Sequence, residues 1–187
     1  IVGAGPAGLG AGLRAKESGL RYLILERTTI ASSIRDYPRE KPVLAEPVGL
    51  PMYGDLPVKT QDKDSLIKAW EDVIQGAQLA VHERQEVTDV TKTNGLYTVT
   101  TAQGEDYAAA YVILAIGARS SPRKLGVPGE DLTKVVYKLS DAADYRGKSV
   151  LVVGGGDSAV EAAVALAKEE GTTVSLSYRK GAFTRAK

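Results

Sequence analysis

The feature that most constrains the fold is a glycine pattern that occurs twice, each time between an apolar run and a stretch with helical spacing. The two copies read Gly3-Ala4-Gly5-Pro6-Ala7-Gly8 and Gly154-Gly155-Gly156-Asp157-Ser158-Ala159. The first glycine makes a tight turn, the second lets a pyrophosphate approach the backbone, and a small third residue lets helix and strand pack closely. Amides at the helix N-terminus then face the phosphates. The pattern therefore predicts two dinucleotide-binding units.

The residues around each turn repeat the same order of strand, turn, helix, glycine and strand. In the first copy, helical spacing over residues 6–18 ends at Gly19, and a buried strand over residues 22–26 follows. Glu26 ends that strand about 20 residues beyond the glycines, where an acidic residue accepts hydrogen bonds from an adenosine ribose. In the second copy, residues 149–153 predict a strand, residues 157–170 a helix and residues 173–178 a further strand.

The two copies differ where the second strand ends. The first has Glu26-Arg27 there, and the second has Tyr178-Arg179-Lys180. A carboxylate would repel a nucleotide 2′-phosphate, whereas arginine or lysine would hold it. We therefore expect the second unit to bind NADPH through Arg179, with Lys180 or Arg185 assisting. A solvated basic tail is the alternative interpretation.

The segment between the two copies carries three further patterns. Residues 28–61 are rich in proline and lack periodicity, which indicates a binding loop. Residues 62–75 predict a helix with Trp70 on its apolar face, and residues 79–84 a short strand. Residues 86–91 and 97–101 flank Asn94-Gly95, a hairpin signal, and a third run follows Gln103-Gly104. Residues 111–116 predict a central parallel strand covered on both faces.

Composition excludes several kinds of chemistry. The chain has no cysteine and a single histidine, His82, so it forms no disulfide, thiolate nucleophile or zinc finger. We expect His82, which follows an apolar strand, to have a surface or structural role. No apolar stretch approaches the roughly 18 to 20 residues of a membrane helix. The sequence thus favours a soluble, cytoplasmic protein without nucleic-acid or membrane partners, whose chemistry a bound group carries. It indicates no catalytic acid or base and no metal site, and it leaves a homodimer open.

Two fingerprints in one chain, with Ala115-Ile116-Gly117 before the second, resemble the two-dinucleotide-binding-domain flavoproteins. The sequence is most similar to the thioredoxin-reductase-like branch, in which Gly-Gly-Gly-Asp-Ser-Ala opens the NADPH domain. The resemblance implies an α/β fold of two Rossmann-like three-layer units with a small antiparallel insert. It implies an FAD-binding domain over residues 1–120 and an NADPH-binding domain over residues 121–187. We expect both to be incomplete, because the chain begins inside a strand and ends soon after one.

The resemblance also implies which residues contact each cofactor. FAD would contact Gly3, Gly5, Pro6, Ala7, Gly8, Glu26, Arg27, Tyr37 and Gly117. NADPH would contact Gly154, Gly156, Asp157, Ser158, Ala159, Arg179, Lys180 and Arg185. For Tyr37, which precedes Pro38, a plain turn is an equally good interpretation.

The activity that the resemblance implies is that of an FAD-dependent NADPH oxidoreductase. Hydride would pass from NADPH to the flavin, and electrons would pass on to an unidentified redox acceptor protein, domain or small molecule. The Cys-x-x-Cys of thioredoxin reductases is absent, which excludes a dithiol relay by this chain. Two alternatives stay open: a flavin monooxygenase with a divergent signature, and a non-catalytic dinucleotide-binding regulatory module.

Overall fold

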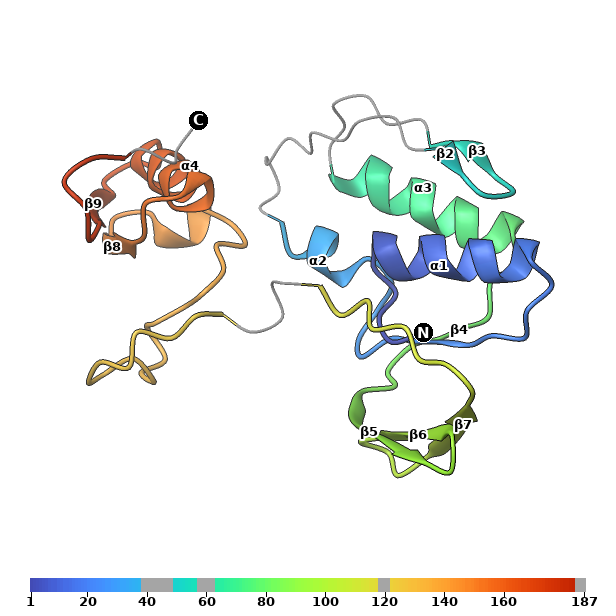
Figure 1. Cartoon of the computed structure of the whole chain (residues 1–187). Coiled ribbons are helices and arrows are strands. Elements are labelled where there is room, and N and C mark those ends of the chain that lie inside the picture. The colour runs from blue at the N-terminus through green and yellow to red at the C-terminus, as the bar shows by residue number, and fades with distance from the viewer. Residues whose placement is uncertain (38–48, 57–62, 118–121, 184–187) are drawn as a thin grey trace. The chain divides into compact units, whose positions relative to one another are not determined.

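The computed structural model describes residues 1–37, 49–56, 63–117 and 122–183 (Figure 1). The chain divides into two compact units, Ile1–Val127 and Pro128–Lys187. This division falls shortly after residue 120, where the sequence places the boundary. Each unit packs helices on short parallel strands, which is the α/β arrangement that the sequence predicts.

The centre of the first unit is a set of parallel backbone pairings. Strand β1 (Ile24–Leu25) pairs with β4 (Val81–His82) on one side. On its other side Leu25 bridges Val2, and Val2 in turn bridges Leu114. The resulting order places the chain's first residues between the second and fourth parallel segments, as in doubly wound nucleotide-binding sheets.

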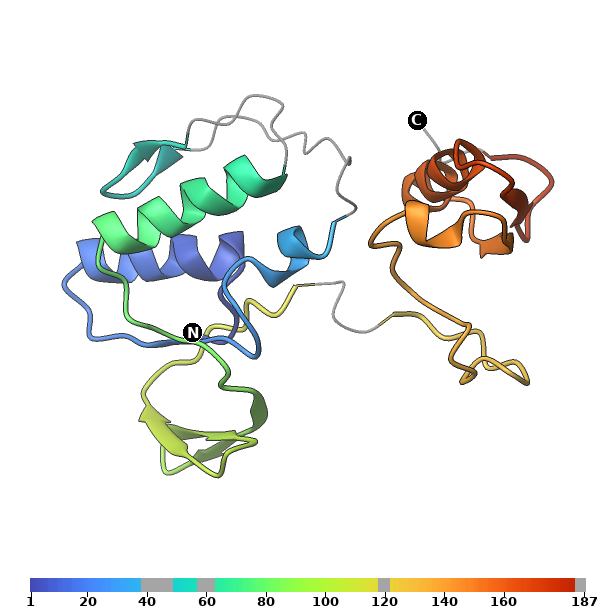
Figure 2. The same ribbon diagram turned by 180° about the vertical axis from the view of Figure 1, so that it is seen from behind.

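Helices α1 (Pro6–Glu17) and α3 (Lys63–Gly76) build the core of this unit. Both lie on the same side of the parallel strands (Figures 1 and 2). A Cβ at Gly12 would come within 2.6 Å of the Ile24 side chain, so this glycine lets α1 approach β1. The buried cluster that joins the two helices to the strand includes Leu9, Leu13, Ile24, Leu66, Ile67, Trp70 and Val73. Trp70 is a core residue, as its position in the helical pattern predicts.

The proline-rich segment contains regular structure where it is described. Helix α2 (Ser32–Arg35) follows the first βαβ unit, and β2 (Gly49–Leu50) pairs antiparallel with β3 (Gly54–Asp55). Leu50 and Leu56 are buried in the core cluster. Residues 38–48 and 57–62 lie outside the described residues, so the predicted binding role of this segment stays a prediction.

The small insert is a three-stranded antiparallel sheet, as predicted. Strands β5 (Val87–Thr93), β6 (Leu96–Thr101) and β7 (Asp106–Ala109) follow one another in sequence and in space. Asn94 and Gly95 form the first turn with φ of 52° and 83°. A two-residue hairpin turn with both φ values positive matches the twist of its strands, and the Asn-Gly pair adopts it at low cost.

Replacing Gly95 by alanine tests the geometry of this turn. Because φ is +83°, a Cβ is strained there, and we expect Gly95→Ala to lower the free energy of unfolding by about 1 kcal/mol. The matched control is Gly10→Ala, in the interior of α1, where a Cβ meets no atom within 4 Å. That change should stabilise the protein by about 0.5 to 1 kcal/mol. Urea denaturation of both variants measures the two opposite signs.

The apolar run over residues 111–116 differs from its prediction. The sequence predicts a central strand covered on both faces, yet Tyr111 is 88% exposed and Leu114 is 64% exposed. Burial of a parallel strand on both faces needs helices on each side of the sheet, and α1 and α3 lie together on one side. Among the described residues only Val2 pairs with this run. The prediction of burial on both faces is therefore wrong for this part of the molecule.

The second unit is a single βαβ arrangement that follows a long connecting segment, residues 128–148. The 3₁₀ helix η1 (Ala143–Tyr145) precedes β8 (Ser149–Val153), helix α4 (Asp157–Ala167) and β9 (Thr173–Ser177). Strands β8 and β9 pair in parallel, and Leu166 of α4 is buried. In this connecting segment, the Tyr137 hydroxyl donates a hydrogen bond to the buried Glu130 carboxylate at 2.7 Å, which raises the pKa of Tyr137.

The described residues contain neither a membrane-spanning helix nor a group of side chains suited to a metal ion. No helix there is long and apolar enough to cross a bilayer. Nor do three histidine, cysteine, aspartate or glutamate side chains of the described residues gather in a group able to hold a metal ion.

Candidate dinucleotide sites

The three glycines of the first glycine turn have different surroundings and therefore different physical roles. Gly3 has φ of 103°, and a Cβ there would overlap the Ala115 carbonyl oxygen. A Cβ at Gly8 would overlap the carbonyl oxygen of Gly3. A Cβ at Gly5 would meet no atom within 4 Å. The chain itself therefore requires the first and third glycines, whereas the open space at Gly5 fits a pyrophosphate that approaches the backbone.

Helix α1 begins at this turn with Pro6 as its first residue and Gly5 as its N-cap. Proline suits the first helical position because that amide has no partner within the helix. The amides of Ala7 and Gly8 follow in the first turn, where helical geometry also leaves the N–H groups without intrahelical acceptors. Pro6 and Ala7 are exposed, so the helix presents its positive end to a ligand.

The Glu26 carboxylate is fixed directly beside this turn. It is 6% exposed, and its Oε2 accepts the Ala4 N–H at 2.8 Å. Its Oε1 accepts the Thr28 N–H at 3.0 Å and the Thr28 hydroxyl at 3.2 Å. A carboxylate offers about four acceptor positions, so Glu26 retains capacity for a ribose hydroxyl while the protein holds its orientation.

Gln85 supplies a further polar group that the sequence did not indicate. Its backbone N–H donates to the Glu26 carbonyl at 2.8 Å. Its side-chain oxygen is buried and has no hydrogen-bond partner among the described residues. A buried acceptor without a partner is costly, and a donor on a ligand beside Glu26, such as an adenine amino group, would satisfy it. The residues present thus fit an adenosine at this position.

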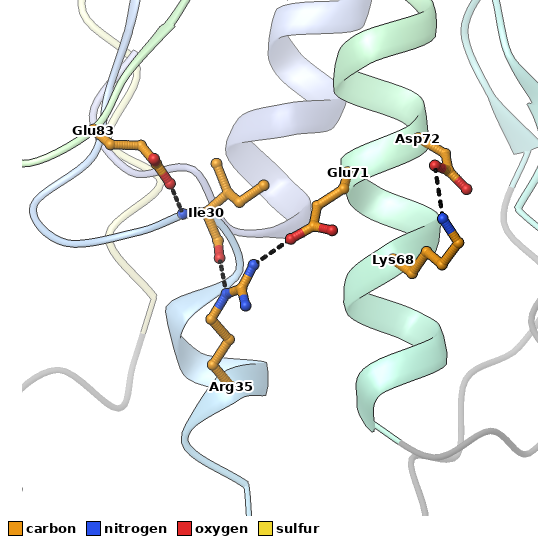
Figure 3. A network of polar contacts seen from close by, with 6 residues as sticks. All are labelled: Ile30, Arg35, Lys68, Glu71, Asp72 and Glu83. Atoms are coloured by element: carbon orange, nitrogen blue, oxygen red, sulfur yellow. Dashed lines mark hydrogen bonds and ion pairs between the residues drawn. The ribbon is translucent and has the colours of Figure 1, made fainter.

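A network of polar contacts holds the loop that follows Glu26 (Figure 3). The Ile30 N–H donates to Glu83 at 2.7 Å, and the Ile30 carbonyl accepts from Arg35 Nε at 3.1 Å. Arg35 Nη2 lies 2.5 Å from the Glu71 carboxylate on α3. Within the same loop Ala31 has φ of 54°, and its N–H donates to the Ala4 carbonyl at 3.0 Å. Contacts from α3 and the residue after β4 therefore position the loop against the first glycine turn.

Replacing Glu71 by glutamine tests the contribution of this network. The side chains of Arg35 and Glu71 are 38% and 49% exposed, and an exposed ion pair contributes about 0.2 to 1 kcal/mol. We expect Glu71→Gln to weaken flavin binding by at most about fivefold, measured as the flavin Kd of the apoprotein. The control is Asp72→Asn, because Asp72 pairs with Lys68 on α3 itself (Figure 3) and should leave that Kd unchanged.

The remaining residues predicted for FAD lie at the edges of this site. Arg27 is exposed directly after Glu26. Tyr37 packs on the core cluster, and its carbonyl accepts Lys63 Nζ at 2.9 Å. Gly117 has φ of 70° and ends the run over residues 111–116. Their contacts with a flavin stay predictions.

The second glycine turn repeats the geometry of the first. Gly154 has φ of 151°, and a Cβ there would lie 3.0 Å from the Ala159 Cβ. Ala159 is therefore accommodated at the third position because the first position has no side chain. A Cβ at Gly156 would meet no atom within 4 Å, the same open space as at Gly5. Helix α4 begins next with Asp157 and Ser158, both exposed.

The cations predicted to hold a 2′-phosphate follow β9. Arg179 and Lys180 are exposed, and neither makes an ion pair with another described residue. Arg185 lies outside the described residues. Two cations at a strand end beside a phosphate turn are suited to an anionic ligand.

Comparisons with known proteins cover nearly the whole chain. A ferredoxin–NADP reductase of Ignicoccus hospitalis is 33% identical over 98% of this chain and 56% of its own length. The bacilliredoxin reductase Bdr of Bacillus subtilis is 32% identical over 98% of this chain and 57% of its own. The chain thus spans a little over half the length of the curated relatives that it matches.

Among solved structures, the bacillithiol disulfide reductase Bdr of Staphylococcus aureus superposes with a TM-score of 0.91 at 29% identity. The superposition covers 98% of this chain and 57% of that one. The model of the pyridine nucleotide-disulphide oxidoreductase family matches residues 1–187. The two glycine turns, the buried Glu26 and these matches show that the chain belongs to the pyridine nucleotide-disulphide oxidoreductase family.

Proposed function

We propose that this chain forms the cofactor-binding part of an FAD-dependent NADPH oxidoreductase, with FAD in the first unit and NADPH in the second. The observation that carries the proposal is the Glu26 carboxylate, buried and held between the amides of Ala4 and Thr28. This is where an adenosine ribose meets the fingerprint. The relatives named reductases of ferredoxin, bacilliredoxin and bacillithiol disulfide support the same assignment.

The residues of each unit perform binding and orientation. In the first unit the α1 amides and Gly5 receive the pyrophosphate, and Glu26 fixes the ribose. In the second unit Gly156, Ser158 and Ala159 receive the pyrophosphate at the start of α4, and Arg179 holds the 2′-phosphate. Hydride transfer from the nicotinamide to the flavin is the chemistry that the two cofactors supply when bound.

The electron acceptor is not a thiol of this chain, because the sequence contains no cysteine. We propose a redox acceptor outside this chain, which is a protein, a further domain or a small molecule and receives electrons from the flavin. The names of the relatives include protein and small-molecule acceptors.

The decisive experiment is an anaerobic titration of the full-length, FAD-loaded protein with NADPH. The proposed function predicts that the visible flavin absorbance is bleached at one NADPH per flavin, and that ferredoxin or a disulfide restores it. A regulatory module would bind NADPH without bleaching. Formation of an oxygenated product after admission of air would instead identify a monooxygenase.

A further inference from the structure

The two units can be aligned residue by residue at the end of their second strands. In the first unit the Gly3 N–H donates to the Leu25 carbonyl at 2.8 Å, and in the second the Gly154 N–H donates to the Ser177 carbonyl at 2.9 Å. The parallel pairings agree, because Val2 lies opposite Leu25 and Val153 lies opposite Ser177. The next residues therefore correspond, so Tyr178 occupies the position that Glu26 occupies in the first unit.

The residues that face these two positions correspond as well. Ala4 follows the first glycine of the first turn, and Gly155 follows the first glycine of the second. In the first unit Glu26 reaches the Ala4 N–H at 2.8 Å. In the second unit a Cβ built on Gly155 would overlap the Tyr178 ring, at nearly equal distances from three adjoining ring carbons.

That geometry places Tyr178 with its ring face, rather than its edge, over Gly155. An approach in the ring plane would bring one carbon much closer than its neighbours. Gly155 is buried although the glycine after it is exposed. Phe183 stacks on Tyr178 with the ring centroids 5.2 Å apart and the planes 16° apart, which is an offset stacked arrangement. The aromatic pair therefore covers the phosphate turn at the point where the first unit has a carboxylate.

We propose that Tyr178 is a specificity-determining residue of the second unit. Position 155 must be glycine because the Tyr178 ring packs directly over it. This inference rests on the proposed NADPH site. The ring occupies the place of the ribose-binding carboxylate, so NADH loses the acceptor that would bind its 2′-hydroxyl. A neutral ring also leaves the field of Arg179 and Lys180 uncompensated for a 2′-phosphate.

The test is equilibrium binding of 2′,5′-ADP (adenosine 2′,5′-bisphosphate) and 5′-AMP to the full-length, FAD-loaded protein, measured by calorimetry. These probes differ only in the 2′-phosphate and report no turnover. Tyr178→Glu should weaken the binding of 2′,5′-ADP by about tenfold or more and should not weaken the binding of 5′-AMP. Tyr178→Phe keeps the ring and should match the wild type with both probes.

The same assay tests whether the Tyr178 ring packs over Gly155. Gly155→Ala should weaken the binding of both probes, because the added Cβ forces the Tyr178 ring away from the turn. Adding Tyr178→Glu to Gly155→Ala recreates the Ala4 and Glu26 pair of the first unit, and should restore the binding of 5′-AMP but not that of 2′,5′-ADP. Flavin content and circular dichroism check that each variant is folded, and Tyr178→Asp, which carries the same carboxylate, replaces Tyr178→Glu if that variant is not.

Three outcomes separate the possible failures. If Tyr178→Glu or Tyr178→Asp weakens the binding of both probes equally, Tyr178 only supports the fold and the inference is wrong. If Gly155→Ala changes nothing, the ring is not seated on the turn and the inference is again wrong. If the wild type itself binds neither probe, the proposed NADPH site is wrong, independently of Tyr178.

Discussion

The Gly5→Val variant of the full-length protein is expected to purify without flavin. A Cβ at Gly5 meets no atom of the chain within 4 Å, and the backbone there is extended with φ of −80°, so we expect the variant to fold. The branched side chain would fill the space in which the pyrophosphate meets the turn. Acid release followed by mass spectrometry measures the bound FAD, which should fall from one per chain to nearly none.

The control for this variant is Gly10→Val in the same helix. A Cβ at Gly10 also meets no atom within 4 Å, but Gly10 lies inside α1, two residues beyond the last glycine of the first pattern. Gly10→Val should retain FAD. If Gly5→Val kept a full complement of FAD, the pyrophosphate would have to bind elsewhere, and the assignment of the first site would be wrong.

The Arg179→Ala variant is expected to lose NADPH affinity about 10- to 100-fold while NADH affinity stays nearly unchanged. A hydrogen bond to a charged group contributes about 1.5 to 3 kcal/mol, and about 1.4 kcal/mol corresponds to a factor of ten. Because Arg179 is exposed, raising the salt concentration should weaken the binding of NADPH to the wild type more than the binding of NADH. Fluorescence titration with each nucleotide measures Kd for the variant and, at low and high salt, for the wild type.

Arg146→Ala is the matched control, because Arg146 belongs to the same unit but bonds to Glu169 at 2.7 Å. It should leave the preference for NADPH intact. Equal losses of NADPH and NADH in Arg179→Ala would mean that Arg179 supports the fold or the shared pyrophosphate, and would exclude it as the 2′-phosphate ligand.

Much of the fold could be predicted from short-range patterns. The Asn94-Gly95 turn requires two positive φ values that few other pairs adopt, so it identified the hairpin. The spacing of Trp70 and its neighbours identified the buried face of α3. The glycine turns were equally informative, because the first and third positions leave no room for larger side chains.

Other features depend on contacts that no local pattern encodes. The exposure of Tyr111 and Leu114 depends on which elements cover the sheet, and an apolar run is the same with or without that cover. The link between Arg35 and Glu71 joins segments far apart in sequence, and the burial of the Gln85 side-chain oxygen follows from tertiary packing. The sequence also did not indicate that the Tyr178 ring packs over Gly155, because the two residues are 23 positions apart.

The contact between Gly155 and Tyr178 also restricts the order in which substitutions can accumulate. While the tyrosine is present, any side chain at position 155 overlaps its ring, so that site is closed to change. Once position 178 has lost the ring, alanine at 155 meets no such obstacle. A lineage that acquires a side chain at position 155 must therefore replace residue 178 first, and the reverse path must restore glycine before the aromatic ring returns.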